Sequence, residues 1–148
     1  AVVPVELVAE LTANPPDRVA ENLVSGRIVR TRLAKNPESW RTSLAQVTAD
    51  NVILAVNARG IDGRDTSWLW DVDYSSLAGK NVVCVSERRR DVAYRLSVQG
   101  IIPQVVPTFA DAVALFDDQP IDAVASYTAF QDLAGEQMGL NVKTGGRS

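Results

Sequence analysis

One loop of this chain gathers the residue types best suited to chemistry. Residues 57–74 hold four aspartates and two of the three tryptophans, directly after the apolar run 52–56. Clustered carboxylates can hold Mg²⁺, which prefers oxygen ligands. A single fixed carboxylate can also orient a histidine, as the third member of a catalytic triad does. Both kinds of chemistry are therefore open for this loop.

A structural interpretation of the same residues is equally specific. Asp62 precedes a glycine, a pair that is typical of turns. Asp65 suits the N-cap of a short helix through Trp70, and its carboxylate would accept from the amides of Ser67 and Trp68. The two tryptophans would then close the hydrophobic core. A capping carboxylate is also well fixed, so the capping role and the triad role are compatible.

Two residue counts exclude whole classes of active site. The chain contains no histidine and a single cysteine, Cys84. Without histidine it cannot form a self-contained Ser-His-Asp or Cys-His site, and an ordinary Cys/His zinc site is excluded too. The chain also has no Walker A or Gly-x-Gly-x-x-Gly motif to hold phosphate, so we predict no metal site. Cys84 lies in an apolar run and is expected to be an unreactive core thiol in a reducing compartment.

Two further segments lie where strands are expected to end. Lys35 and Asn36 precede Pro37, and they form either a strand-to-helix turn or a nucleotide and phosphate contact at a helix N-terminus. The run of arginines at 88–90 is interpreted either as a solvated helix face or as a contact for an anionic ligand or partner.

Length and composition describe one ordinary globular domain. The chain has 148 residues, 46% of them hydrophobic, and a formal net charge of −3. This charge gives no reason to expect a nucleic-acid partner. The sequence has no run of about 18 apolar residues that would predict a transmembrane segment. Residues 1–10 contain two glutamates and no basic region, unlike a signal peptide.

Apolar runs alternate with helical patterns along most of the chain. Strands are predicted at 27–34, 51–56, 81–85, 101–106 and 121–125, and helices at 38–47, 87–99, 108–116 and 127–138. The predicted fold is α/β, with three layers and a mostly parallel sheet of about five or six strands that helices cover on both faces, as in Rossmann-like proteins. In such a sheet, the loops at the carboxyl ends of the strands form the ligand site.

The two ends of the chain depart from this alternation. Residues 1–25 are interpreted as a linker or the remnant of a preceding domain, with short helices at 4–11 and 18–24. Residues 26–140 form the predicted domain, and residues 141–148 form a flexible tail.

Several of these motifs together resemble one known family. They are the run 33–37 (LAKNP), Asn57, the run 62–68 (DGRDTSW), and Tyr127 with Thr128. Over residues 26–140 the chain is similar to the C-terminal domain of MurT, the Mur-ligase-like subunit of lipid II isoglutaminyl synthase. The DGRDTSW run is long and unusual, and it carries most of the resemblance. The fold that it implies is that of Mur ligase C-terminal domains.

The resemblance implies part of an ATP-dependent ligase of peptidoglycan biosynthesis. The full enzyme would convert D-glutamate to D-isoglutamine in lipid II, with ATP and Mg²⁺ activating the carboxylate. A GatD-type class I glutaminase, the second subunit of a heterodimer, would release ammonia with a cysteine and a histidine. Asp65 would then be the catalytic residue that completes the glutaminase site. Lys35 and Asn36 would contact the nucleotide.

The same resemblance gives Asp62, Trp68 and Trp70 a loop-shaping or partner-contact role. The family's central ATPase domain and its cysteine zinc ribbon are not in this sequence, so the domain alone is expected to be inactive and without bound cofactor. The enzyme is expected in the cytoplasm, at the inner face of the membrane.

One alternative is a non-catalytic heterodimerisation module that docks the glutaminase through the Trp-rich loop. Another is an independent Mg²⁺-phosphate enzyme of response-regulator type.

Overall fold

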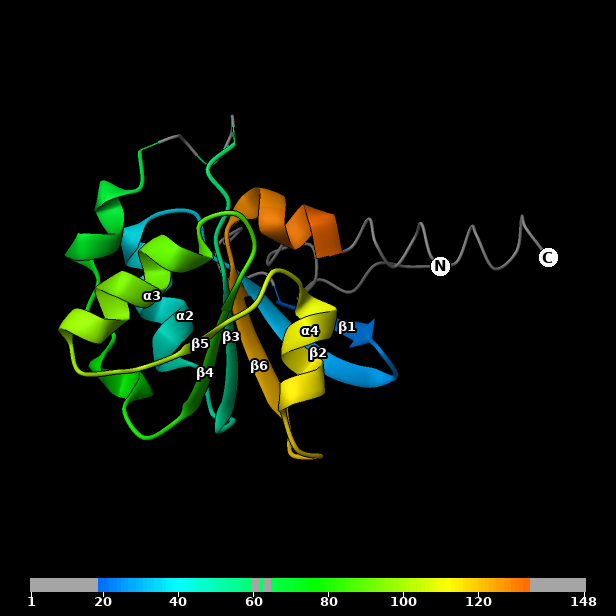
Figure 1. The fold of residues 1–148 in the computed structure, drawn as a ribbon. Coiled ribbons are helices and arrows are strands. Elements are labelled where there is room, and N and C mark those ends of the chain that lie inside the picture. The colour runs from blue at the N-terminus through cyan, green and yellow to red at the C-terminus, as the bar shows by residue number, and fades with distance from the viewer. Residues whose placement is uncertain (1–18, 60–61, 63–64, 134–148) are drawn as a thin grey trace, which may run out of the picture.

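A mostly parallel sheet forms the centre of the structure. The computed structural model describes residues 19–59, 62 and 65–133. These residues build a six-stranded sheet in the order β1-β2-β6-β3-β4-β5, with helices on both faces (Figure 1). β1 (Val19–Val24) runs antiparallel to β2 (Arg27–Leu33), and the other neighbouring strands are parallel. The predicted α/β class with a mostly parallel sheet is therefore confirmed.

The remaining elements follow the predicted alternation of strands and helices. The other strands are β3 (Asn51–Ala55), β4 (Asn81–Val85), β5 (Gln104–Val105) and β6 (Ile121–Ala125). The connecting helices are α2 (Pro37–Ala45), α3 (Arg89–Val98) and α4 (Phe109–Leu115), and residues 127–133 are also helical. The long connection between β3 and β4 contains the 3₁₀ helices η3 (Ser67–Asp71) and η4 (Ser75–Leu77).

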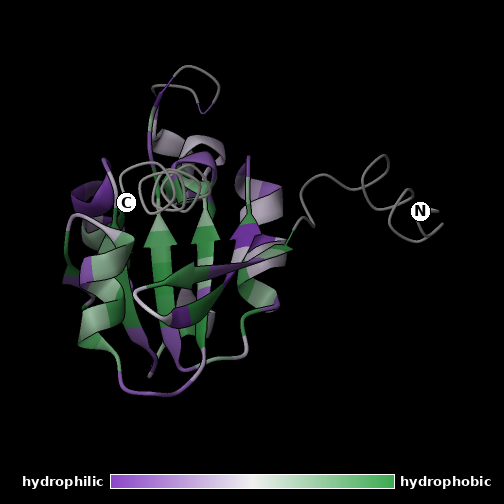
Figure 2. Cartoon of the chain, turned by 90° about the vertical axis from the view of Figure 1, so that its right-hand side faces the viewer, coloured by the Kyte–Doolittle hydropathy of each residue, from purple (hydrophilic) through white to green (hydrophobic). Residues whose placement is uncertain are grey.

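Helices cover both faces of the central strands, and β3 accordingly buries every side chain. Val52 and Leu54 face the layer of α2 and α3, whereas Ile53 and Ala55 face α4 and the helix at 127–133. Figure 2 shows the apolar colour of these central strands. A continuous apolar run is what a strand covered on both faces requires. This explains why the central strands could be predicted from sequence.

The helix predicted at 18–24 is wrong, because β1 occupies this segment. Exposed and buried residues alternate along the second half of β1, as they do in a strand. Ser25 and Gly26 have φ values of 51° and 80°, as a two-residue hairpin turn requires, and they fold β1 back onto β2. The domain limits at 26 and 140 stay predictions, although the sheet begins before residue 26. The helix predicted at 4–11 and the tail at 141–148 lie outside the described residues.

The edge strand β5 is shorter than the strand predicted at 101–106. Pro103 directly precedes it, and proline cannot donate to a strand ladder. The helix ends on either side of β5 are marked by local signals. Gly100, two residues after α3, has a φ of 81°. At the start of α4, the Thr108 hydroxyl accepts from the amide of Asp111 at 3.1 Å.

Candidate functional site

Asn57 joins the carboxyl ends of three parallel strands. It follows β3 and is buried, with 3% of its surface exposed. Its amide donates to the Ser126 hydroxyl after β6 at 3.0 Å, and its Oδ1 accepts from the Glu87 amide after β4 at 3.1 Å. Its Nδ2 donates to Asp132 at 3.1 Å. The predicted site loops therefore meet at one edge of the sheet.

Asp62 connects the loop to the helix at 127–133. Its Oδ1 accepts from the Thr128 amide at 3.0 Å, and its Oδ2 accepts from the Thr128 hydroxyl. The Arg59 amide donates to the same carboxylate at 3.3 Å. Asp62 is half-buried and bridges residues far apart in the sequence. This geometry agrees with a loop-shaping role.

Asp65 lies exposed in the loop, and its carboxylate interacts with Ser67. The Ser67 amide donates to Oδ1 at 2.9 Å. This bond, aided by the Ser67 hydroxyl, holds the pKa of Asp65 below its usual value. The carboxylate is therefore ionised at neutral pH. No other described residue donates to it, and a carboxylate has about four lone-pair sites, so Asp65 can still accept a donor from another chain.

The predicted N-cap role of Asp65 needs correction. The N-cap of η3 is Thr66, which makes no capping side-chain bond, and the helix is of the 3₁₀ type. Asp65 precedes the cap by one residue and forms an Asx turn over Ser67. The bond expected from the Ser67 amide is present, whereas the structure has none from Trp68. The carboxylate is fixed by a local turn and not by a helix end.

Two arginines hold the end of η3. Arg95 of α3 donates through Nε to the Leu69 carbonyl at 3.2 Å and through Nη2 to the Val72 carbonyl at 2.7 Å. Arg41 of α2 donates to the Asp71 carbonyl at 2.8 Å. The sequence analysis missed both residues. The position of Arg95 beside buried residues of α3 is a signal that could have identified it.

The two loop tryptophans have different environments. Trp68 is half-buried and packs on the buried ring of Trp40, with centroids 5.5 Å apart. Trp70 is 49% exposed and lies edge-on to Tyr94, with centroids 5.9 Å apart. Trp68 therefore helps to close the core as expected, and Trp70 does not.

Lys35 and Asn36 lie at the start of α2. The Asn36 Oδ1 accepts from the Ser39 amide at 2.9 Å, and the Ser39 hydroxyl accepts from the Asn36 amide at 3.0 Å, which completes a capping box. Lys35 is exposed and lines a cavity of about 30 Å³ together with Asp62 and Trp68. The structure thus brings Lys35, Asp62 and Trp68 together, but Asn36, Asp65 and Trp70 do not line this cavity.

A second cavity at the same edge, of about 210 Å³, is bordered by an ion-pair network. Arg59 pairs with Glu87 at 2.7 Å and with Asp132 at 3.0 Å. Its hydrogen bonds to these carboxylates raise the pKa of Arg59. Of the arginine run, Arg88 pairs with Asp91 at 3.6 Å. Arg89 donates to the Ser86 carbonyl at 2.9 Å, and these local partners favour the solvated-face interpretation for Arg88 and Arg89.

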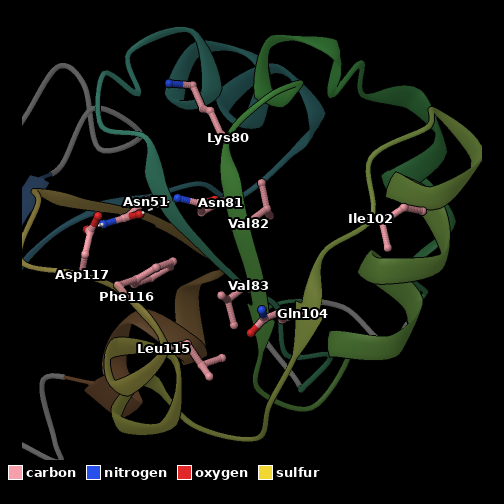
Figure 3. Close-up of a pocket in the computed structure, with 10 residues that line it drawn as sticks. All are labelled: Asn51, Lys80, Asn81, Val82, Val83, Ile102, Gln104, Leu115, Phe116 and Asp117. Carbon is pink, nitrogen blue, oxygen red and sulfur yellow. Dashed lines mark hydrogen bonds between the residues drawn. The ribbon is translucent and has the colours of Figure 1, made fainter.

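A larger cavity, of about 340 Å³, lies at the opposite ends of the strands (Figure 3). The Asn51 amide group donates to Asp117 at 2.8 Å, and Asn81 donates to Asn51 at 3.1 Å. The bond from Asn51 holds the pKa of Asp117 below its usual value. None of the predicted site residues lines this cavity. Asn51, Asn81 and Asp117 thus bond to one another across this end of the sheet.

Three other predictions concern a metal site, the reactivity of the Cys84 thiol and a transmembrane segment. Across residues 19–59, 62 and 65–133, no three His, Cys, Asp or Glu side chains come together as metal ligands would. Cys84 is fully buried, and burial raises the pKa of its thiol to about 12. In the described part of the chain, no helix has the length and apolar character needed to cross a membrane.

Comparisons with known proteins identify relatives of this chain. The lipid II isoglutaminyl synthase (glutamine-hydrolyzing) subunit MurT of Staphylococcus aureus strain COL is 30% identical over 82 residues, covering 50% of this chain and 19% of that protein. The same subunit of strain N315 gives the same values. The chain thus spans about a fifth of the length of these curated relatives. The crystal structure of the UDP-N-acetylmuramate-alanine ligase MurC from Thermotoga maritima is similar with a TM-score of 0.46 and 11% identity, covering 84% of this chain and 30% of that chain.

A match to a protein family covers all of the predicted site residues. The family model described as MurT ligase C-terminal matches residues 33–130. This range includes Lys35, Asp62, Asp65 and Thr128, and it extends over more than half of the chain. This chain is therefore a member of the MurT ligase C-terminal family.

Proposed function

We propose that this chain is the C-terminal domain of an ATP-dependent amidotransferase subunit that converts D-glutamate to D-isoglutamine in lipid II. In this proposal, Asp65 completes the Cys-His site of a class I glutaminase partner of the GatD type. Membership of the family supports it, and the relatives from Staphylococcus aureus are named as subunits of a glutamine-hydrolyzing synthase. The domain alone is inactive, and the full enzyme works in the cytoplasm at the inner face of the membrane.

One observation carries the proposal: an exposed, ionised carboxylate in a chain without histidine. Asp65 is oriented by the Ser67 amide and keeps acceptor capacity toward solvent. The third member of a triad needs only to be fixed, ionised and accessible to the histidine that it orients. This chain has no histidine, so that histidine lies outside it, and in this proposal it belongs to the partner. Asp65 meets each requirement.

The chemistry follows from the geometry of a triad. The partner's histidine would donate a hydrogen bond from Nδ1–H to Asp65, which leaves Nε2 free to accept the proton of the partner's cysteine. The resulting thiolate attacks the carbonyl carbon of the glutamine side-chain carboxamide and forms a tetrahedral intermediate. The histidine then returns the proton to the amide nitrogen, the C–N bond breaks, and ammonia departs to leave an acyl-enzyme. Water later hydrolyses the acyl-enzyme to glutamate.

The nucleotide contact is a separate part of the proposal. Of the two predicted residues, Lys35 fits a phosphate, because its side chain is exposed at the rim of the small cavity. The Oδ1 of Asn36 is already bonded to the Ser39 amide, so Asn36 would act by shaping the turn. ATP and Mg²⁺ would supply carboxylate activation in the full enzyme.

The test compares the glutaminase activity of the partner alone, with this chain, and with the Asp65→Asn variant. We expect the wild-type chain to activate the partner. The variant should bind equally well but lose up to about 10⁴-fold in kcat, since the orienting carboxylate is gone. Asp73→Asn is a matched control, because Asp73 is also exposed and accepts from the amide two residues later, Ser75, at 3.0 Å. If Asp65→Asn activates as well as wild type, the triad role is refuted.

A second candidate is a docking module without a catalytic residue. Trp70 is 49% exposed and packs against Tyr94, which is 65% exposed. Tryptophan and tyrosine are enriched at the energetic centres of protein interfaces. In this case Trp70→Ala should weaken partner binding by more than about tenfold, whereas Asp65→Asn should leave both binding and activity unchanged. Measuring both variants by titration calorimetry and by activity separates the two functions.

A further inference from the structure

Arg95 is a buried arginine that contacts several residues at the end of the loop. Only 9% of its surface is exposed. Its guanidinium donates to the carbonyls of Leu69 and Val72, and it lies over the rings of Trp70 at 5.0 Å and Tyr74 at 5.4 Å. A planar guanidinium can satisfy two carbonyls and stack on aromatic rings at the same time, and an ammonium group cannot.

We infer that Arg95 is a positioning residue for Asp65, holding η3 in the conformation that presents this carboxylate to the partner's histidine. The inference rests on the function proposed for Asp65. A short series of contacts links the two side chains. Arg95 holds the Leu69 carbonyl, and the Leu69 amide donates to the Thr66 carbonyl at 3.0 Å. The Ser67 amide in the same turn orients the Asp65 carboxylate at 2.9 Å.

The turn needs this support because it is short. A 3₁₀ helix of five residues has poor hydrogen-bond geometry and gains little from cooperativity. A cation near the final carbonyls of a helix stabilises them. Arg41 also donates to this end, at the Asp71 carbonyl, but Arg41 is exposed and water can take its place. Arg95 is buried between α3 and η3, which lie on the same face of the sheet (Figure 1).

The test uses Arg95→Lys in the full chain, assembled with the glutaminase partner. Lysine keeps the charge but cannot reach both carbonyls. A displacement of about 1 Å in a catalytic group can lower the rate by about 10²-fold, so we expect kcat to fall at least about tenfold. The KM for glutamine should change less than about twofold, because the glutamine pocket lies on the partner. Arg90→Lys, at an exposed position of the same helix, is the control and should match wild type.

A double variant shows whether Arg95 acts through Asp65. If it does, adding Arg95→Lys to Asp65→Asn causes no further loss of kcat, since the two effects are not additive. If the two losses multiply in full, or if KM rises while kcat stays constant, the positioning role is overturned although Asp65 remains catalytic. Arg95→Gln retains a donor without the charge and makes the same prediction, so the result does not depend on one substitution.

A partner-free measurement completes the test. Hydrogen exchange of the Ser67 and Leu69 amides should accelerate at least about tenfold in Arg95→Lys and stay unchanged in Arg90→Lys, if Arg95 holds this turn. Unchanged exchange in Arg95→Lys overturns the inference whatever the partner does. If Asp65→Asn alone leaves activity intact, the proposed function fails, and the positioning role toward the partner's histidine fails with it even where exchange accelerates.

Discussion

Asp62 and Asp65 are three residues apart, and substitution by asparagine should lower stability at Asp62 but leave it nearly unchanged at Asp65. Asp62 accepts from the amides of Thr128 and Arg59 and from the Thr128 hydroxyl, with both oxygens in use. Asparagine offers one acceptor oxygen and one amino group. In either orientation its amino group faces a backbone N–H that then loses its acceptor.

The magnitude follows from the bonds lost. An unsatisfied, partly buried donor costs roughly 1–3 kcal/mol, so Asp62→Asn should lower the free energy of unfolding by about 2 kcal/mol. For a chain of this size, that corresponds to a decrease in Tm of about 4–8 °C. Asp65 is exposed and accepts from Ser67, a bond that asparagine can also make. Asp65→Asn should therefore change the free energy of unfolding by less than about 0.5 kcal/mol.

The assay is urea unfolding followed by tryptophan fluorescence, since Trp40 is fully buried and Trp68 packs on its ring. Two matched substitutions within one loop control for the change in charge. The reasoning is refuted if both variants lose the same stability, or if Asp65→Asn is the less stable of the two. Equal losses would mean that both carboxylates contribute alike, and a larger loss in Asp65→Asn would mean that the loop is held mainly through Asp65.

Two further predictions concern Cys84 and the start of α2. Because burial raises the pKa of Cys84 to about 12, the native chain should resist a thiol reagent at pH 8 and react only after unfolding. The contribution of the buried, protonated thiol to folding stability is complete below the ordinary pKa of about 9 and is lost as the pH rises toward 12. Rapid labelling of the native chain would contradict this. Asn36→Ala should lower the free energy of unfolding by about 1 kcal/mol through loss of the capping box, whereas Lys35→Met should leave unfolding unchanged and raise the KM for ATP in the full enzyme. The reverse pattern, measured by thermal unfolding and by ATP kinetics, would assign the nucleotide contact to Asn36 instead.

The parts of the fold that could be predicted are those in which one segment carries its own signal. The five buried residues of β3 form a continuous apolar run, and Thr108 and Gly100 mark helix ends through local bonds and backbone angles. β1 carries no such signal of its own, because this segment is a strand only through its pairing with β2. A strand therefore replaces the helix predicted at 18–24, and Gly26 closes the hairpin turn that follows it.

The candidate site also has local features that the sequence predicts and other features that it does not. The sequence predicts the position of the loop and its bond between Asp65 and Ser67, since both are local. It does not predict the role of Arg95, because a buried arginine in a helix resembles a surface arginine until the carbonyls that it meets are known. Trp68 and Trp70 differ in exposure because residues two apart in a 3₁₀ helix, with about three residues per turn, point to different sides of it.

The bonding of the aspartates gives a physical reason to treat Asp65 separately. Asp62 bonds to Thr128, and buried Asp122 accepts from the amides of Thr48 and Ala49, each at 2.9 Å. Both carboxylates join segments distant in sequence, as a structural carboxylate does. Asp65 bonds only to a residue two positions away and joins no two parts of the described structure. Folding stability therefore depends little on Asp65, which leaves its carboxylate available for the proposed role of orienting a histidine from another chain.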